Sequence, residues 1–431
     1  MQWSYLLIYV ALAAAVVVVH LARRGMKERA HAASLKEATE AGMMEPPSLH
    51  PIINPERCMG SAACVQACPE EALGIIQGKA VLVNPASCIG HGACQVVCPV
   101  NAIRLVFGTE KRGIDIPNVR PNFETNIAGI FIAGELGGMG LIRKAAEQGR
   151  QALETIRSRK GGKPDLDVVI VGAGPAGISA GLGAIQHKLR YKIVEQEDSL
   201  GGAIYHYPRN KVAMTAPVKL PVIGSVKMGE ISKEKLLEFW HAVVTKTGLM
   251  IAFNEKMETI ERKEDGFLVK TSKASYQTRS VLLAIGRRGS PRKLGVPGEE
   301  QSKVVYRLID PEQYRGMAVL VVGGGDSALE AAIAIAEQPD TNVVLSYRSA
   351  AFQRVKERNR ERLAQQEQAG RLRVIFNSKV KKIEANTVSL EFDNATCEMP
   401  NDGVIVCAGG ELPIPLLQKI GITFETKHGT D

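Results

Sequence analysis

Six of the eight cysteines in this 431-residue chain fall between Cys58 and Cys98, inside a segment that is repeated after thirty residues. The first copy returns in the second as Asn54-Pro55 and Asn84-Pro85, Cys58 and Cys88, Cys64 and Cys94, and Cys68-Pro69 and Cys98-Pro99. Disulfide frameworks are typical of short secreted chains, so clustered cysteines in a chain of this length indicate a metal centre. A zinc site is the simplest alternative, but it explains neither the duplication nor the Cys-Pro ends.

The duplicated segment resembles the bacterial two-cluster ferredoxins, whose run is C-x2-C-x2-C-x3-C-P with the last cysteine binding the other cluster. The second cysteine of both runs is missing, and Ser61 and His91 stand in its place. The resemblance implies two sets of three thiolate ligands, namely Cys58, Cys64 and Cys98 for one cluster and Cys88, Cys94 and Cys68 for the other. Each centre is then expected to be a 3Fe-4S cluster, or a 4Fe-4S cluster with a fourth ligand other than cysteine.

The fourth ligand is open between several candidates. His91 is the stronger one, although a histidine in such a loop also serves as a hydrogen-bond donor to sulfur. Ser61 is the weaker one, because a neutral hydroxyl is a poor ligand for a soft iron site. Water or an external ligand would complete the set equally well.

Two glycine-rich loops, each between a buried strand and a helix, indicate two dinucleotide-binding folds. The first follows a strand predicted at 167–171, and its βαβ unit ends at Glu195, where an acid would hold a ribose hydroxyl. Its glycines let a pyrophosphate approach the N-terminus of the helix. The residues of this predicted site are Gly172, Gly174, Pro175, Ala176, Gly177 and Glu195.

The second loop follows a strand predicted at 318–322 and contains Gly323, Gly325, Asp326 and Ser327. Its next strand is predicted at 342–346. Arg348 then stands where an NAD-selective site would have a carboxylate, and Arg354 and Lys356 follow. Basic residues at this place favour the 2′-phosphate of NADPH over NADH. A solvated basic helix is the alternative interpretation of these charges.

Residues 167–431 resemble the thioredoxin-reductase-like flavoproteins, in which an FAD domain is interrupted by an NADPH domain. The resemblance rests on both glycine loops and on the crossings at Ala284-Ile285-Gly286 and Ala408-Gly409. It implies an α/β fold with two nested Rossmann-like domains, and it places Gly201 and Gly202 at the FAD. The segment 304–310 lacks the redox-active Cys-x-x-Cys of thioredoxin reductases, which excludes a thiol relay there. Bacterial reductases of low-molecular-weight-thiol disulfides also lack it.

The closing motif of this superfamily, T-x-x-P-G-I-Y-A-x-G-D followed by a helix, is missing after the second crossing but has a counterpart at 125–135. We therefore predict a circular permutation, with 111–157 as the displaced final piece of the FAD domain. Gly134 and Glu135 would contact FAD, and a helix beginning near Gly140 and Leu141 would face the flavin, where its dipole stabilises an anion. An ordinary strand-turn-helix packed on the ferredoxin is the alternative.

The run from Trp3 to Leu21 has no charged residue and is long enough to cross a bilayer as a helix. Basic residues follow at 23–29, so the positive-inside rule predicts a single-pass anchor in the cytoplasmic (inner) membrane with the catalytic domains in the cytoplasm. A cleaved signal peptide is disfavoured, because its charges would precede the apolar run.

The predicted parts are an anchor (1–24), a linker (25–53), a ferredoxin-like domain (54–110), the permuted piece (111–157), a linker (158–166), the FAD domain (167–288), the NADPH domain (289–399) and the return to the FAD domain (400–431).

Together these parts predict an electron-transfer enzyme. NADPH delivers an electron pair, clusters pass single electrons, and a flavin converts between them. We expect electrons to pass from NADPH through FAD and two clusters to a redox partner protein or quinone, or in reverse, and we assign no catalytic side chain. The alternatives are a disulfide or sulfur-compound reductase acting at the flavin, and a membrane-tethered redox sensor or conduit.

The phosphate site and the basic residues after the apolar run partly account for the net charge of +9, so no nucleic-acid partner is expected. The flavoprotein resemblance also implies a homodimer.

Overall fold

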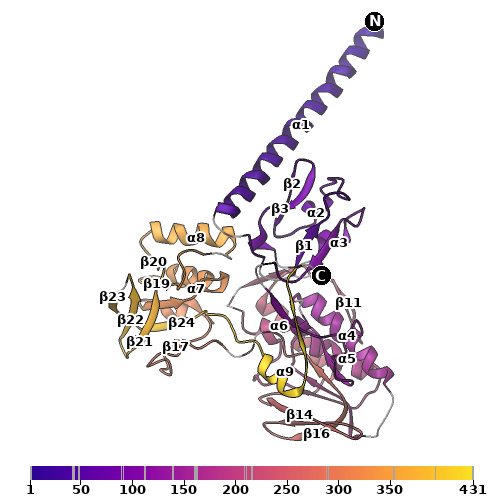
Figure 1. Ribbon diagram of the computed structural model, residues 1–431, viewed down its shortest axis with the longest axis vertical. Coiled ribbons are helices and arrows are strands. Elements are labelled where there is room, and N and C mark those ends of the chain that lie inside the picture. Colours follow the sequence, from indigo (N-terminus) through magenta and orange to yellow (C-terminus); the bar gives the residue numbers. More distant parts are fainter. Residues whose placement is uncertain are drawn as a thin grey trace. The chain divides into compact units, whose positions relative to one another are not determined.

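The computed structural model describes residues 2–40, 44–46, 49–88, 90, 92–110, 113–137, 140–159, 164–207, 209, 211–214, 217–287, 289, 291–352, 355–393 and 395–429 (Figure 1). Within the first helix, the side chains of residues 2–8, 10, 12 and 13 are outside this description. The chain divides into two compact units. The first unit comprises Met1–Gly113, Ala351–Glu357 and His428–Asp431, and the second comprises Ile114–Ala350 and Arg358–Lys427.

The first unit begins with one long helix, α1 (Gln2–Glu40), whose second half packs on strand β2 (Leu73–Ile76). His31 makes the central contact, because its Nδ1 lies 3.1 Å from the backbone nitrogen of Ile75. Gly74 lies directly beneath the imidazole ring, where a Cβ atom would come within 2.6 Å of it. The Glu28 carboxylate accepts a hydrogen bond from the backbone N–H of Gln77. The second half of α1 is therefore an integral part of this unit.

The predicted membrane anchor is not borne out. In the part of the chain that the structure describes, none of the helices combines enough length with enough apolar character to cross a membrane. The apolar run forms the first part of α1, and the same helix continues without a break through the basic residues to Glu40. The predicted single-pass location in the cytoplasmic membrane, with residues 1–24 as the anchor and membrane contact, is thus corrected.

The rest of the first unit repeats the same elements in both copies of the duplicated segment. Each copy contributes a short helix and a strand, and the strands pair within antiparallel ladders, β2 with β3 and β1 with β4. The short helices α2 and α3 begin after residues in the left-handed region, Ala62 (φ 59°) and Gly92 (φ 79°). The elements of this region are β1 (His50–Ile53), α2 (Ala63–Gln66), β3 (Lys79–Leu82), α3 (Ala93–Val96) and β4 (Ile103–Val106), together with β2.

The larger sheet of the second unit has the parallel order β13-β8-β7-β16, with β15 and β14 added antiparallel. Strand β6 pairs in parallel with the end of β16, so that Phe131 lies opposite Leu282. The central strands are nearly continuous runs of buried Val, Ile and Leu, as expected for a sheet covered on both faces. The strands are β6 (Ile130–Ile132), β7 (Leu166–Val171), β8 (Tyr191–Val194), β13 (Ile251–Ala252), β14 (Met257–Lys263), β15 (Gly266–Thr271) and β16 (Ser275–Leu283).

Helices α4 (Ile142–Ser158) and α5 (Pro175–Gln186) pack against each other beside this sheet. Their closest approach is at Gly149, where a Cβ atom would overlap the carbonyl oxygen of Ala176. Gly183 packs in the same way under Leu153. Helix α6 (Lys233–Thr247) contributes the fully buried Trp240 to the same core. The segment before β7, from β6 to α4, is therefore built into the sheet that follows it in the chain.

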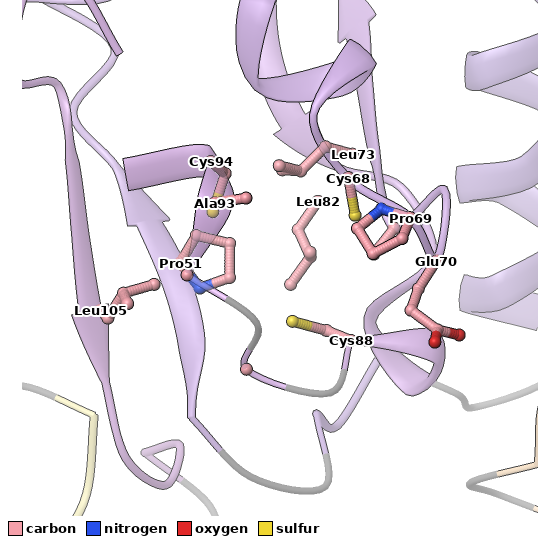
Figure 2. Close-up of a pocket in the computed structure, with 13 residues that line it drawn as sticks. Pro51, Cys68, Pro69, Glu70, Leu73, Leu82, Cys88, Ala93, Cys94 and Leu105 are labelled. Carbon is pink, nitrogen blue, oxygen red and sulfur yellow. The ribbon is translucent and has the colours of Figure 1, made fainter. Parts of the chain in front are cut away.

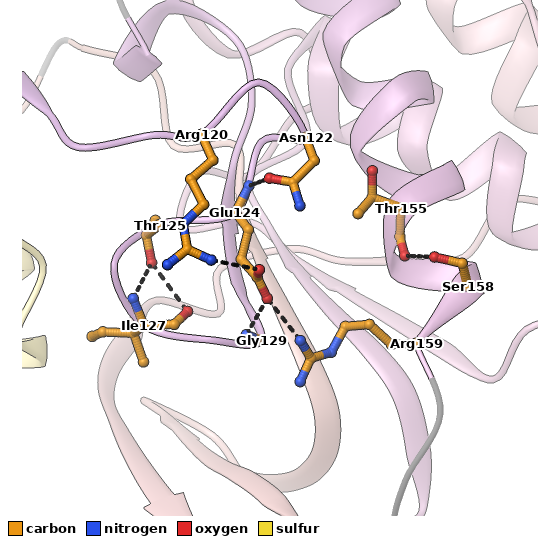
Figure 3. A network of polar contacts seen from close by, with 9 residues as sticks. All are labelled: Arg120, Asn122, Glu124, Thr125, Ile127, Gly129, Thr155, Ser158 and Arg159. Carbon is orange, nitrogen blue, oxygen red and sulfur yellow. Dashed lines mark hydrogen bonds and ion pairs between the residues drawn. The ribbon is translucent and has the colours of Figure 1, made fainter.

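A buried carboxylate ties the two ends of that segment together (Figure 3). Glu124 accepts hydrogen bonds from the backbone N–H of Gly129, at 2.9 Å, and from Arg159 Nη1, at 2.7 Å. Arg120 approaches its other oxygen at 3.6 Å. Gly129 lies just before β6 and Arg159 follows α4, so one side chain fixes both the entry and the exit of the segment.

We expect Glu124→Ala to lower the free energy of unfolding by about 2–3 kcal/mol, because charge-assisted hydrogen bonds in a nearly buried site are lost. Glu312→Ala is the matched control, since its pair with Arg315 is exposed and such pairs contribute about 0–1 kcal/mol. Urea denaturation of both variants measures the difference. Equal losses in the two variants would contradict a structural role for Glu124.

The second sheet of this unit is parallel throughout, in the order β17-β24-β18-β19-β20. Strand β24 lies between β17 and β18, with Val404 opposite both Val304 and Leu320. The boundary expected at residue 400 therefore differs from the structure, because 403–406 hydrogen-bond inside this sheet. The strands are β17 (Val304–Val305), β18 (Ala318–Val322), β19 (Asn342–Ser346), β20 (Leu372–Ile375) and β24 (Gly403–Val406).

Smaller elements complete the second unit. Helices α7 (Asp326–Ala336) and α8 (Glu357–Gln368) follow β18 and β19, and α9 (Ile414–Ile420) contacts β14. The remaining ladders are antiparallel: β9 (Val212–Met214) with β12 (Glu230–Ser232), β10 (Val218–Leu220) with β11 (Gly224–Val226), β5 (Ile114–Pro117) with β25 (Phe424–Lys427), and the set β21 (Lys379–Ile383), β22 (Thr387–Phe392) and β23 (Ala395–Pro400). The predicted α/β class is confirmed.

Candidate functional sites

Three cysteines from both copies of the repeat surround one cavity of the first unit. Cys58, Cys64 and Cys98 line a cavity of about 310 Å³, together with Ser61 at its exposed rim. The backbone N–H of Ala80 points to Cys58 Sγ at 3.4 Å, and that of Ala102 points to Cys98 Sγ at 3.2 Å. The structure thus brings together the first predicted set of thiols.

The second predicted set surrounds a second cavity, of about 370 Å³ (Figure 2). Cys88 and Cys94 come from the second copy of the repeat, and Cys68 comes from the first copy. Gly90 and Gly92 line the same cavity. His91, between these glycines, lies outside the described residues.

Three of these thiols are held in surroundings that favour the neutral form. Burial raises the pKa of Cys64 and of Cys88, and it raises the pKa of Cys94 to about 11. A thiolate is the metal-ligating form, so binding iron here must be accompanied by proton release. Among the described residues, no three His, Cys, Asp or Glu side chains converge on a point where one metal ion would sit.

This donor set fits an iron-sulfur cluster. Each set of three sulfur atoms surrounds a cavity lined largely by apolar residues, and backbone N–H groups point at two of the sulfurs in the first cavity. Soft thiolate ligands with N–H donors to sulfur are what clusters require. The two cysteines outside the repeat are Cys397, which is exposed in β23, and Cys407, which is half-buried.

The first glycine loop has the close packing that a dinucleotide loop needs. Gly172 has φ +107°, and a Cβ atom there would lie 2.5 Å from the carbonyl oxygen of Ala284. A Cβ atom on Gly177 would overlap the carbonyl oxygen of Gly172. Pro175 is the first residue of α5, where its missing N–H costs nothing, and Ala176 is buried beside it.

Gly202 lies against this loop, because a Cβ atom on it would be 3.1 Å from the Cα atom of Gly174. Gly201 (φ +108°) precedes it and donates its N–H to the carbonyl of Ala173 at 2.9 Å. The structure therefore brings Gly201 and Gly202 against the first glycine loop, as predicted for residues of one site. Open space remains at Gly174: among the described residues that are not its neighbours in the chain, only Gly202 Cα comes within 4 Å of an added Cβ.

Glu195 directly follows strand β8, and its carboxylate is turned toward the loop. It accepts the N–H of Ala173 at 2.7 Å and that of Glu197 at 3.0 Å. Burial raises its pKa, and these N–H donors oppose that effect. A buried acid beside the loop is the arrangement predicted for a ribose hydroxyl.

The segment around Gly134 meets the same loop from the other side. Gly134 (φ +88°) donates its N–H to Gln148 Oε1 at 2.8 Å, and an added Cβ would lie 3.2 Å from Ala176 Cβ. Glu135 follows and approaches Gly140, since a Cβ atom there would lie 3.4 Å from Glu135 Oε1. Leu141 is the residue that precedes α4.

Arg287 is a residue of this region that sequence reasoning missed. It directly follows the first predicted crossing, at Gly286, and donates from Nη2 to the carbonyl oxygen of Asp115 at 3.4 Å. Burial lowers its pKa, and the charges of Glu135 and Asp115 oppose that effect. No local pattern marks it, because Glu135 lies about 150 positions earlier in the chain.

The second glycine loop, between β18 and α7, has a similar construction. A Cβ atom on Gly323 (φ +150°) would lie 2.5 Å from the Cys407 carbonyl oxygen. Gly325 and Ser327 are exposed at the N-terminus of α7, with open space at Gly325. Asp326 accepts a hydrogen bond from Asn359 Nδ2 at 2.7 Å. The loop thus leaves room for a phosphate group at the helix N-terminus.

The basic residues predicted beyond this loop are found in different places. Arg348 is exposed two residues after β19. Arg354 lies outside the described residues. Lys356 belongs to the first unit, where its ammonium lies 2.6 Å from Glu70 Oε2.

Comparisons with known proteins match both parts. Residues 50–99 match the model of a 4Fe-4S dicluster domain, and residues 169–430 match the model described as pyridine nucleotide-disulphide oxidoreductase. A ferredoxin–NADP reductase of Streptococcus gordonii is 34% identical over 183 residues, which are 41% of this chain and 53% of that protein. One of Thermus thermophilus is 28% identical over 271 residues, 60% of this chain and 77% of that protein. The chain thus spans about half the length of the first of these relatives.

Two solved structures share the fold. Bacillithiol disulfide reductase from Staphylococcus aureus aligns with a TM-score of 0.52 and 24% identity over 59% of this chain and 80% of that one. The enzyme from Bacillus cereus aligns with a TM-score of 0.53 and 22% identity over 59% and 81%. The predicted α/β fold is thereby confirmed, and the cysteine repeat is similar to a 4Fe-4S dicluster domain. Because the larger match spans more than half of the chain, this protein belongs to the pyridine nucleotide-disulphide oxidoreductase family of FAD-dependent enzymes.

Proposed function

We propose that this protein transfers electrons between NADPH and a redox partner protein, through FAD and two iron-sulfur clusters. One observation carries the proposal: the chain that holds two dinucleotide loops also holds two separate cavities, each surrounded by three cysteines. A bound flavin supplies the exchange between electron pairs and single electrons. The ferredoxin–NADP reductase name of the relatives supports the same chemistry.

The chain's own residues would bind and orient these groups. The N-terminus of α5 would offer its N–H groups to the FAD pyrophosphate, Glu195 would hold the ribose, and Gly201 and Gly202 would border the same site. The N-terminus of α7, with Gly323, Gly325, Asp326 and Ser327, would do the same for NADPH. The six cysteines of the repeat would hold the clusters in two sets of three.

A circular permutation of the FAD domain is part of the proposal. Three observations support it: β6 pairs in parallel with β16, α4 packs on α5 at Gly149, and Gly134 lies beside Ala176 of the first loop. In this arrangement Glu135 approaches the FAD, and the residues preceding α4, Gly140 and Leu141, face its flavin. Arg287 is then a further candidate for the same site, because it donates a hydrogen bond to the carbonyl oxygen of Asp115 in β5, and β5 contacts the turn Glu135–Gly137.

The preference for NADPH rests on Arg348, which is exposed just after β19. We expect Arg348→Ala to raise the KM for NADPH roughly 10- to 100-fold and to leave that for NADH almost unchanged, since a charge-assisted hydrogen bond to the 2′-phosphate contributes about 1.5–3 kcal/mol. Arg373→Ala, on the neighbouring strand β20, is the control. Steady-state kinetics with NADPH and with NADH measures both KM values. An equal rise in the two KM values would contradict the assignment of Arg348 to the 2′-phosphate.

The test of the whole proposal is an anaerobic titration of the full chain with NADPH, followed by optical and electron paramagnetic resonance spectra and by iron and sulfide analysis. The expected result is bleaching of the flavin together with reduction of two clusters, and the spectra separate 3Fe-4S from 4Fe-4S centres. Clusters that stay oxidised while the flavin is bleached would contradict the proposed route. Rapid NADPH oxidation by small disulfides would then favour a disulfide reductase acting at the flavin.

A further inference from the structure

The two cysteine cavities are built from equivalent positions of one repeat, so they can be compared residue by residue. Cys68-Pro69-Glu70 in the first copy corresponds to Cys98-Pro99-Val100 in the second. Glu70 lines the cavity of Cys68, Cys88 and Cys94, and Val100 lines the other cavity at the equivalent place. Glu70 thus lines one cavity where Val100 lines the other, and Figure 2 shows Glu70 next to Pro69 at the first of these cavities.

The carboxylate of Glu70 is largely removed from water, with 14% of its side chain exposed. Its partner is Lys356, at 2.6 Å, which is more exposed (35%) and does not line the cavity. Glu70 is therefore the less hydrated member of the pair, and it is the member that lines the cavity. Charges in such surroundings act more strongly on their neighbours than charges in water do.

The other cavity has a cation near it instead. Lys79 donates a hydrogen bond from Nζ to the carbonyl oxygen of Cys58 at 2.7 Å. Thirty positions later the chain has Thr109, which is uncharged. An acidic residue therefore lines one site and a lysine ammonium is hydrogen-bonded beside the other, although both sites present three cysteines.

A reduced cluster carries one more negative charge than an oxidised one, so a neighbouring anion disfavours reduction and a neighbouring cation favours it. We propose that Glu70 sets the order of the two clusters, by lowering the reduction potential at Cys68, Cys88 and Cys94 below that at Cys58, Cys64 and Cys98. The inference rests on the two clusters of the proposed function. A single electron then resides mainly at the cluster beside Lys79.

The experiment is a redox titration of the cluster-loaded full chain, followed by electron paramagnetic resonance. Glu70→Gln keeps the shape and removes the charge. It should raise the reduction potential of the cluster at Cys68, Cys88 and Cys94 by about 59 mV. For one electron this corresponds to a tenfold change in the ratio of the two singly reduced forms, in favour of that cluster. Glu71→Gln is the matched control, because Glu71 is exposed and does not line the cavity.

Lys356→Met gives an independent check that leaves the cavity wall intact. Removing the cation that partly offsets Glu70 should shift the same potential in the opposite direction. The inference would be overturned if neither variant changed the two reduction potentials, or if both potentials shifted equally. The proposed function would still stand in either case. A wild-type chain that binds fewer than two clusters would overturn both.

Discussion

Replacing Cys64 with serine should remove the cluster of the first cavity and leave the second intact, and Cys94→Ser should do the reverse. A serine hydroxyl is a poor ligand for soft iron, and each cavity has only three cysteines to begin with. Bound iron should fall by one cluster in each single variant and to near zero in the double variant. Reduction of the flavin by NADPH should stay unchanged, because the dinucleotide loops are not touched, while transfer to a one-electron partner should be lost.

Cys397→Ser is the control for these variants, because Cys397 is the exposed cysteine of β23 and lies in neither cavity. Its iron content and its electron transfer should equal those of the wild type. Iron analysis, electron paramagnetic resonance and stopped-flow absorbance of the flavin measure the three quantities. Undiminished transfer to the partner in the double variant would show that the clusters do not lie on the route.

Gly149→Ala should cost the protein its FAD. The added methyl group would overlap the backbone carbonyl of Ala176, so α4 and α5 must separate, and Ala176 belongs to the first glycine loop. Overpacking typically costs about 1–3 kcal/mol, and the upper end is expected because backbone yields less than a flexible side chain. FAD bound per chain, measured by absorbance after gel filtration, and the thermal midpoint should both fall.

Gly25→Ala is the matched control, since Gly25 lies inside helix α1 with no atom within 4 Å of an added Cβ. Glycine in an open helix position is less stable than alanine by about 1 kcal/mol, so this variant should be slightly stabilised. Full FAD content and an unchanged midpoint in Gly149→Ala would mean that α4 does not support the loop. That result would also count against the permutation.

The interpretations that came from sequence rest on spacing within short stretches. The glycine loop at 172–177 and the predicted strands at 167–171 and 318–322 appear in the structure within one residue, because strand, turn and helix propensities act locally. The two sets of cysteines were grouped through the ferredoxin resemblance, and the structure brings each set to one cavity.

The membrane anchor shows the limit of composition. An uncharged run of 19 residues satisfied the length rule, but the structure forms one helix, Gln2–Glu40, whose later residues pack on β2 through His31. The continuation of a helix beyond an apolar run depends on what its next turns contact. That information lies at Gly74 and Ile75, more than forty positions away.

Sequence by itself determined the chemistry that this chain can offer: six clustered thiols, two phosphate-binding loops and an acid after the first of them. Tertiary structure alone decided how these groups are surrounded. Glu124 meets Arg159 across 35 positions, and Glu70 meets Lys356 across 286. Contacts between such distant residues depend on how the sheets and helices pack, which no local pattern records. The charge beside each cavity, and with it the proposed order of the two clusters, therefore became visible only in the folded chain.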